Sequence, residues 1–208
     1  MFSSAFTKFS LAGRLLAQYP AICLIQKSWF HKKPIPVSWS RPEFGWTKLN
    51  FDGSSLGRTG ESSIGGVFRN HNAEFLLGYS EPIGKTTSTV AELIALRRGL
   101  ELVLENDWSS VWLEGDAKTL VEILVRKRRV KCEEVQEQLS LINLIIPELE
   151  NCIISHVFRE GNRAADKLAR MGHLSKKARI WRYVPPDEVL PIVLEDAEGK
   201  IVLRRRGG

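Results

Sequence analysis

Cysteine is scarce in this 208-residue sequence, and long apolar runs are missing. The three cysteines, Cys23, Cys132 and Cys152, are odd in number and far apart, without the C-x-x-C spacing of a zinc site or a disulfide framework. The four histidines are equally scattered, so we expect no structural metal centre built from Cys and His. No stretch of about 18 uncharged apolar residues is present, so we expect no membrane-spanning segment.

Acidic residues are absent from positions 1–42, which carry six Lys or Arg together with several Ser. This composition is typical of an organellar presequence, and the alternative is a basic disordered tail. We therefore predict that residues 1 to about 33 direct import into a mitochondrion or chloroplast, with the nucleus or cytoplasm as the alternative location. Pro34, Pro36 and Pro42 then predict a non-helical linker.

The net charge of +6 suggests a polyanionic partner, but the excess lies outside the middle of the chain. Residues 46–172 contain sixteen Lys or Arg and eighteen Asp or Glu, a net charge of −2. The one dense cluster of cations in this acidic segment is the run from Arg126 to Lys131.

Hydrophobic periodicity divides the chain into three regions: 1–45, a targeting segment and linker; 46–172, one α/β domain; and 173–208, a C-terminal extension with weak structure of its own. Alternation of apolar and polar residues predicts strands, and apolar residues every three to four positions predict helices. The predicted strands are 46–52, 63–69, 74–80, 111–114 and 153–158, and the predicted helices are 89–105, 117–127, 133–146 and 162–171. The order predicts a five-stranded mixed sheet flanked by helices.

Four acidic residues stand at the ends of these elements: Asp52, Glu92, Asp116 and Asp166. Each also has a purely structural interpretation. Asp52 could serve a turn, and Glu92 could complete a capping box with Thr89. Asp116 could cap a helix, and Asp166 could stand in the first turn of a helix because the helix dipole favours an anion there.

The position of Glu92 argues that the placement of the four acidic residues is not a coincidence. Glu92 shares a helix face with Leu96, Gly99 and Val103, so its carboxylate leans toward the sheet. A buried carboxylate needs a compensating charge, and converging carboxylates repel one another. Divalent ions would supply that charge, and magnesium prefers carboxylates, water and phosphate as ligands.

The chain resembles the type 1 ribonuclease H family, especially the plant reverse-transcriptase-like ribonuclease H domains, over about residues 46–172. The motifs that carry the resemblance are KLNFDGS from Lys48, GGVFR from Gly65, AELIAL from Ala91, LEGDA from Leu113 and HVFREGNRAADKLA from His156. The resemblance implies a ribonuclease H-like fold and hydrolysis of the RNA strand of RNA/DNA hybrids. It further implies that the four acidic residues are catalytic and bind two Mg²⁺ ions, with Mn²⁺ as a possible substitute. We expect no haem and no nucleotide cofactor.

The sequence departs from the family pattern at one loop. Many members have a histidine before the last acidic residue, whereas Arg159-Glu160-Gly161 occupies that shortened loop here. His156 lies in the preceding strand, where a structural role is favoured. The departure leaves the metal chemistry intact and puts a proton-handling histidine in doubt.

Contacts to the nucleic acid are predicted from position alone. Ser54, Ser88 and Thr89 follow or precede the acidic residues and would contact the 2′-hydroxyls that distinguish RNA. Arg159 and the basic run Arg126, Lys127, Arg128 and Arg129 would contact phosphates. The alternative for the run is a solvated helix end whose cations suit the dipole.

Two other function classes compete with the nuclease. One is a non-catalytic nucleic-acid-binding or scaffold protein with the same fold, although a retained acidic quartet disfavours it. The other is an exonuclease or integrase of the superfamily, which the motifs AELIAL and NRAAD disfavour.

Overall fold

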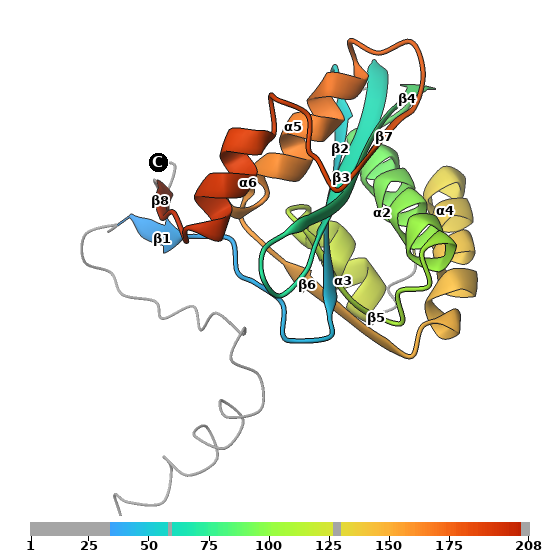
Figure 1. Cartoon of the computed structure of the whole chain (residues 1–208). Helices are drawn as coiled ribbons and strands as arrows, with labels where there is room; N and C mark the ends of the chain where they lie inside the picture. Colours follow the sequence, from blue (N-terminus) through green and yellow to red (C-terminus); the bar gives the residue numbers. More distant parts are fainter. Residues whose placement is uncertain (1–33, 58–59, 127–129, 205–208) are drawn as a thin grey trace, which may run out of the picture. The chain divides into compact units, whose positions relative to one another are not determined.

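The computed structural model describes residues 34–57, 60–126 and 130–204, and Figure 1 shows their arrangement. These residues belong to one compact unit that begins at Pro34. No helix within the described ranges has the length and apolar character needed to cross a membrane.

The core of the unit is a six-stranded mixed sheet with strand order β6-β5-β2-β3-β4-β7. The strands are β2 (Thr47–Ser55), β3 (Glu61–Arg69), β4 (Phe75–Lys85), β5 (Ser110–Gly115), β6 (Asn151–His156) and β7 (Arg179–Arg182). Strands β2, β3, β4 and β7 are antiparallel neighbours, while β5 and β6 continue the sheet in parallel from β2. The predicted mixed α/β fold is confirmed, with one strand more than expected.

Helices cover both faces of this sheet (Figure 1). Apolar residues of α2 (Ser88–Glu105), α3 (Lys118–Arg126) and α4 (Glu133–Ile145) share one core with Leu49 and Phe51 of β2. On the other face, α5 (Arg163–Gly172) and α6 (Leu190–Ala197) pack around Val67. Strand β2 is therefore held between two helical layers.

Two glycines allow the helices to approach the sheet closely. A Cβ on Gly53 would overlap the backbone of Ala91 and Glu92 in α2. A Cβ on Gly65 would overlap the backbone of Leu168 and Ala169 in α5. Any larger residue at either position would push a helix away from the end of β2.

The described residues on either side of 46–172, namely 34–45 and 173–204, contain more regular structure than predicted. Strand β1 (Ile35–Val37) pairs with β8 (Val202–Arg204), and Trp39 is buried. The expected weak structure after His173 is wrong for residues 179–204, because β7 extends the sheet and α6 completes the second core. The partners of these short elements lie far away in the sequence, so local periodicity did not indicate them.

Candidate metal centre

The start of α2 leaves the carboxylate of Glu92 free of any capping role. The N-cap is Thr87, whose side chain accepts a hydrogen bond from the Val90 amide at 3.3 Å. A capping box between Thr89 and Glu92 is therefore wrong. Glu92 lies one turn into the helix, is only 7% exposed, and faces the end of β2.

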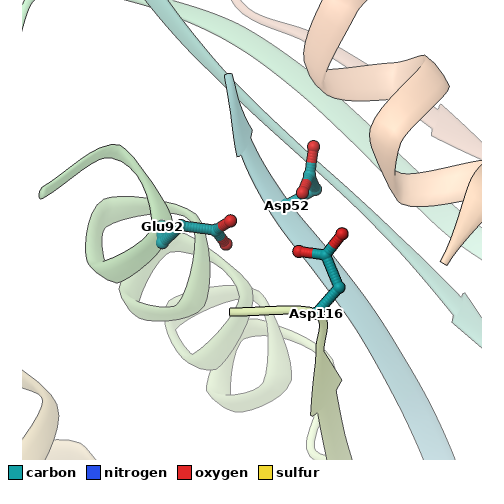
Figure 2. A group of neighbouring side chains, drawn as sticks. All are labelled: Asp52, Glu92 and Asp116. Atoms are coloured by element: carbon teal, nitrogen blue, oxygen red, sulfur yellow. The ribbon is translucent and has the colours of Figure 1, made fainter. Parts of the chain in front are cut away.

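Three acidic side chains from three elements converge at this point, as Figure 2 shows. Asp52 comes from β2, Glu92 from α2, and Asp116 follows the end of β5. One carboxylate oxygen of each lies within 4.8 Å of the others. We call these residues the acidic cluster.

Burial makes this clustering of like charges unfavourable. Burial, followed by the carboxylates of Asp116 and Asp166, raises the pKa of Asp52 well above its ordinary value. Burial and then Asp52 raise the pKa of Glu92 in the same way, partly offset by a hydrogen bond from the Gly53 backbone. The pKa of Asp116 is also raised, mainly by burial. Without a cation, the acidic cluster favours protonated carboxyl groups.

The residues of the acidic cluster fit a divalent cation. The Oε2 atom of Glu92 is buried and has no hydrogen-bond partner. Among the described residues, the one cation that pairs with the cluster is Arg159, whose Nε lies 3.2 Å from Asp116 Oδ2, but its side chain is 80% exposed. An oxygen-only donor set with uncompensated charge suits Mg²⁺ or Mn²⁺.

Asp166 lies beside the acidic cluster but outside the group of three. Its carboxylate is bound by Arg170 one turn along α5, at 2.9 Å. Asp166 and Asp52 nevertheless line the same open groove, whose volume is about 300 Å³. The structure therefore brings all four predicted acidic residues to one place.

The predicted substrate contacts divide into three groups. Ser54, Ser88 and Arg159 line the groove. Thr89 is exposed but is not among the residues that line it. Lys127, Arg128 and Arg129 lie outside the described residues; Arg126 ends α3, and its side chain is also outside the described part.

Two further residues at this site were not predicted from the sequence. His173, at the end of α5, lines the groove, and its Nε2 lies 2.9 Å from Ser54 Oγ. Asn162 stands at the N-cap position of α5, but its side chain makes no cap bond there. Instead, Asn162 Nδ2 donates to the carbonyl of Phe51 at 2.9 Å, which fixes the start of α5 beside Asp52.

A second group of buried polar and charged residues surrounds Lys48 and Asn50 of the same strand, β2, and contains cations as well as carboxylates. Lys48 Nζ contacts Glu114 Oε2 at 2.7 Å, and Arg69 Nη1 contacts Asp196 Oδ2 at 2.8 Å. Asn50 joins the two pairs, because its Oδ1 accepts from Arg69 and its Nδ2 donates to Glu114. We call these five residues the balanced cluster.

Comparisons with known proteins agree with this fold and site. The family model described as "Reverse transcriptase-like" matches residues 50–172. An Arabidopsis thaliana protein provisionally named a ribonuclease H protein is 32% identical over 173 residues, or 81% of this chain. The chain spans 27% of the length of that curated relative.

Solved structures give the same result. A crystal structure of LC11-RNase H1 in complex with RNA/DNA hybrid is 30% identical, with a TM-score of 0.58 over 62% of this chain and 99% of that one. The ribonuclease H1 of Halobacterium salinarum is 23% identical, with a TM-score of 0.60 over 62% of this chain and 97% of the other. This second likeness concerns the fold alone.

Proposed function

Because this chain belongs to the reverse transcriptase-like family of ribonuclease H domains, we propose that it hydrolyses the RNA strand of RNA/DNA hybrids with the aid of divalent metal ions. The observation that carries the proposal is the acidic cluster, in which three buried carboxylates meet without a buried cation among the described residues. Support also comes from LC11-RNase H1, which is 30% identical and was crystallised with a hybrid.

In this proposal the acidic residues hold and orient the metal. Asp52, Glu92 and Asp116 would be its ligands, and Asp166, which lines the same groove as Asp52, would complete the set. Bound magnesium, with two ions at full occupancy, would supply a Lewis acid for the scissile phosphate and would lower the pKa of the attacking water. The rigid position of α2 against Gly53 keeps the ligands aligned before substrate arrives.

Selection of RNA would come from hydroxyl groups along the groove. Ser54 and Ser88 both line it and would exchange hydrogen bonds with 2′-hydroxyls. Ser54 Oγ already has His173 Nε2 as a partner at 2.9 Å, so its orientation is set before substrate binds. Arg159, exposed at the rim, would contact a phosphate.

The experiment compares four labelled duplexes that share one sequence: RNA/DNA hybrid, RNA/RNA, DNA/DNA and a DNA duplex with a single ribonucleotide. Purified full-length protein is incubated with each in Mg²⁺, in Mn²⁺ and in EDTA. We expect cleavage of the RNA strand of the hybrid with either metal and none in EDTA. Hybrid binding without cleavage under any metal condition would refute the proposal and favour the non-catalytic alternative.

We also propose that residues 1 to about 33 act as an import signal for a mitochondrion or chloroplast. The support is their basic, acid-free composition. A fluorescent protein fused to residues 1–45 is expected to enter one of these organelles. A fusion that stays diffuse in the cytosol and nucleus would contradict the proposal.

A further inference from the structure

A basic segment follows α5, beyond the residues that the family model matches. Residues 174–183 read LSKKARIWRY and contain four cations, no acidic residue and two aromatic residues. We call them the C-terminal basic segment. The chain leaves α5 at His173, turns, and returns beside β4 as β7 (Figure 1).

The register of the sheet places this segment close to the acidic cluster. Asp52 pairs with Gly65, Gly65 with Ser80, and Ser80 with Arg179, so these four residues form one row across four strands. Neighbouring strands lie about 4.8 Å apart, so Arg179 is about 14 Å from Asp52 along the row. Base pairs rise by about 3.4 Å, so this distance equals about four base pairs of a bound duplex.

The turn between α5 and β7 also begins at the groove itself. His173, the residue before the segment, contacts Ser54 and lines the groove together with Arg170. The chain therefore passes directly from a residue that lines the groove into the C-terminal basic segment.

The cations of the segment are free to bind an external anion. Lys176, Lys177 and Arg179 are exposed and form no ion pair with the acidic groups of the described residues. Arg182 donates to the neutral Oδ1 of Asn106 at 2.7 Å and keeps its charge unpaired. The other exposed arginine nearby, Arg170, differs because it pairs with Asp166.

The segment is ordered before any ligand binds. Four residues of β7 pair with β4, and the Tyr183 amide donates to the Leu76 carbonyl at 2.9 Å. Within the turn, Ser175 Oγ donates to the Lys177 carbonyl at 2.6 Å. Binding would therefore cost little backbone entropy, and the 77% exposed ring of Tyr183 adds a planar surface.

We propose that the C-terminal basic segment binds the sugar-phosphate backbone of the duplex whose RNA strand lies in the groove, with Lys176, Lys177 and Arg179 as the phosphate contacts. The inference rests on the proposed function for the identity of the duplex. Charge complementarity and continuity with the groove favour a nucleic acid over other polyanions.

The test compares three proteins that all carry Asp52→Asn, so that substrate survives. The first has no further change, the second carries Lys176→Gln, Lys177→Gln and Arg179→Gln, and the third keeps the charges with Lys176→Arg, Lys177→Arg and Arg179→Lys. Affinity for the hybrid is measured in EDTA at four salt concentrations, and thermal melts confirm that each protein is folded.

We expect the Gln variant to bind at least about tenfold more weakly at 0.1 M salt, with the slope of log K against log salt reduced by two to about three. The charge-preserving variant should match the parent. An unchanged slope in the Gln variant would overturn the inference. Binding of the same proteins to phosphatidylserine vesicles is measured as well. A Gln variant that loses vesicle binding but keeps full hybrid binding would also overturn the inference.

The outcome separates the inference from the proposed function. Cleavage by the wild-type chain with an unchanged slope refutes only the inference. A reduced slope without cleavage by the wild-type chain refutes only the hydrolytic function.

Discussion

Strand β2 contributes residues to two groups of buried charged side chains, which differ in their balance of positive and negative charge. In the balanced cluster, Lys48 and Arg69 each contact a carboxylate at 2.8 Å or less. In the acidic cluster, which begins with Asp52, three carboxylates face one another and the nearest cation is on an exposed side chain. The first group is complete within the chain, whereas the second lacks positive charge that must come from outside.

This contrast separates a structural role from a functional one. A buried charge is tolerated when it is paired and fully hydrogen-bonded. The balanced cluster meets the pairing part of this condition, because groups from β2, β3, β5 and α6 pair each cation with a carboxylate, although the buried Nε of Arg69 has no hydrogen-bond partner. These contacts join α6 to the sheet. The acidic cluster violates the condition, and such violations are expected where a protein binds a ligand.

The largest expected effect comes from removing one charge of the acidic cluster. Asp52→Asn keeps the size of the side chain but removes a metal ligand, so we expect magnesium-dependent cleavage of the hybrid to fall by about 10³-fold or more. Single-turnover cleavage rates would measure it. Substantial cleavage by this variant would remove Asp52 from the ligand set.

Asp107→Asn is the matched control for that change. Asp107 is exposed and has a φ of 54°, a conformation that Asn adopts readily. Both variants lose one carboxylate and gain one amide, so only the position differs. We expect the control to cleave at the parental rate.

Breaking the balanced cluster should affect stability and leave the chemistry of the folded protein unchanged. Arg69→Met removes the cation bound to Asp196 and Asn50, and we expect the free energy of unfolding to fall by about 3–5 kcal/mol. Urea titration would measure it, with Arg97→Met on the surface of α2 as the control, expected to cost about 1 kcal/mol or less. A loss for Arg69→Met as small as that of the control would mean that the buried contacts of Arg69 stabilise the protein no more than a surface ion pair does.

The smallest expected effect is a pH-dependent one in the acidic cluster. Burial raises the pKa of Glu92 above its ordinary value of 4.5, so above that pH the unfolded chain releases a proton that the folded chain retains. The stability of the metal-free protein should therefore fall as the pH rises from about 5. Glu92→Gln removes this penalty, so its Tm should exceed that of the parent at neutral pH by about 2–4 °C for each 1 kcal/mol gained.

Melting curves between pH 5 and pH 8, with EDTA or Mg²⁺, would measure the difference in Tm between Glu92→Gln and the parent. Mg²⁺ should raise the Tm of the parent and leave that of Glu92→Gln nearly unchanged. Glu101→Gln, on the same helix but away from the cluster, should behave as the parent in both conditions. A Glu92→Gln variant that loses stability in EDTA would contradict the interpretation.

The sequence was informative wherever the signal was local. Alternation in residues 47–52 and the apolar repeat of α2 marked elements that the structure confirms, because burial on one face imposes those periods. The four acidic residues stood out for the same reason, since each sits at the end of such an element. His173 could have been found too: Asp166, Arg170 and His173 are spaced i, i+4 and i+7 and share one face of α5.

Features that depend on distant partners could not be predicted. Strand β7 has four residues and no clear alternation, and it is a strand because the edge of β4 offers hydrogen bonds. Arg69 ends a predicted strand, and no local signal shows that it is 1% exposed, because α6 brings Asp196 to it from far along the chain. The bridge from Asn162 to Phe51 likewise spans 111 positions and leaves no local trace.

The pairing of Arg69 with Asp196 also sets an order of events during synthesis. The two residues are 127 positions apart, and ribosomes add about 5–20 residues per second. Asp196 is therefore synthesised about 6–25 s after Arg69. During that interval the guanidinium cannot be buried at low cost, and the face of β2 that carries Asn50 must stay hydrated. The acidic cluster is complete once Asp116 has been made, 80 residues before Asp196. On a nascent chain, the candidate metal site would therefore be assembled before the sheet that supports it is fully covered.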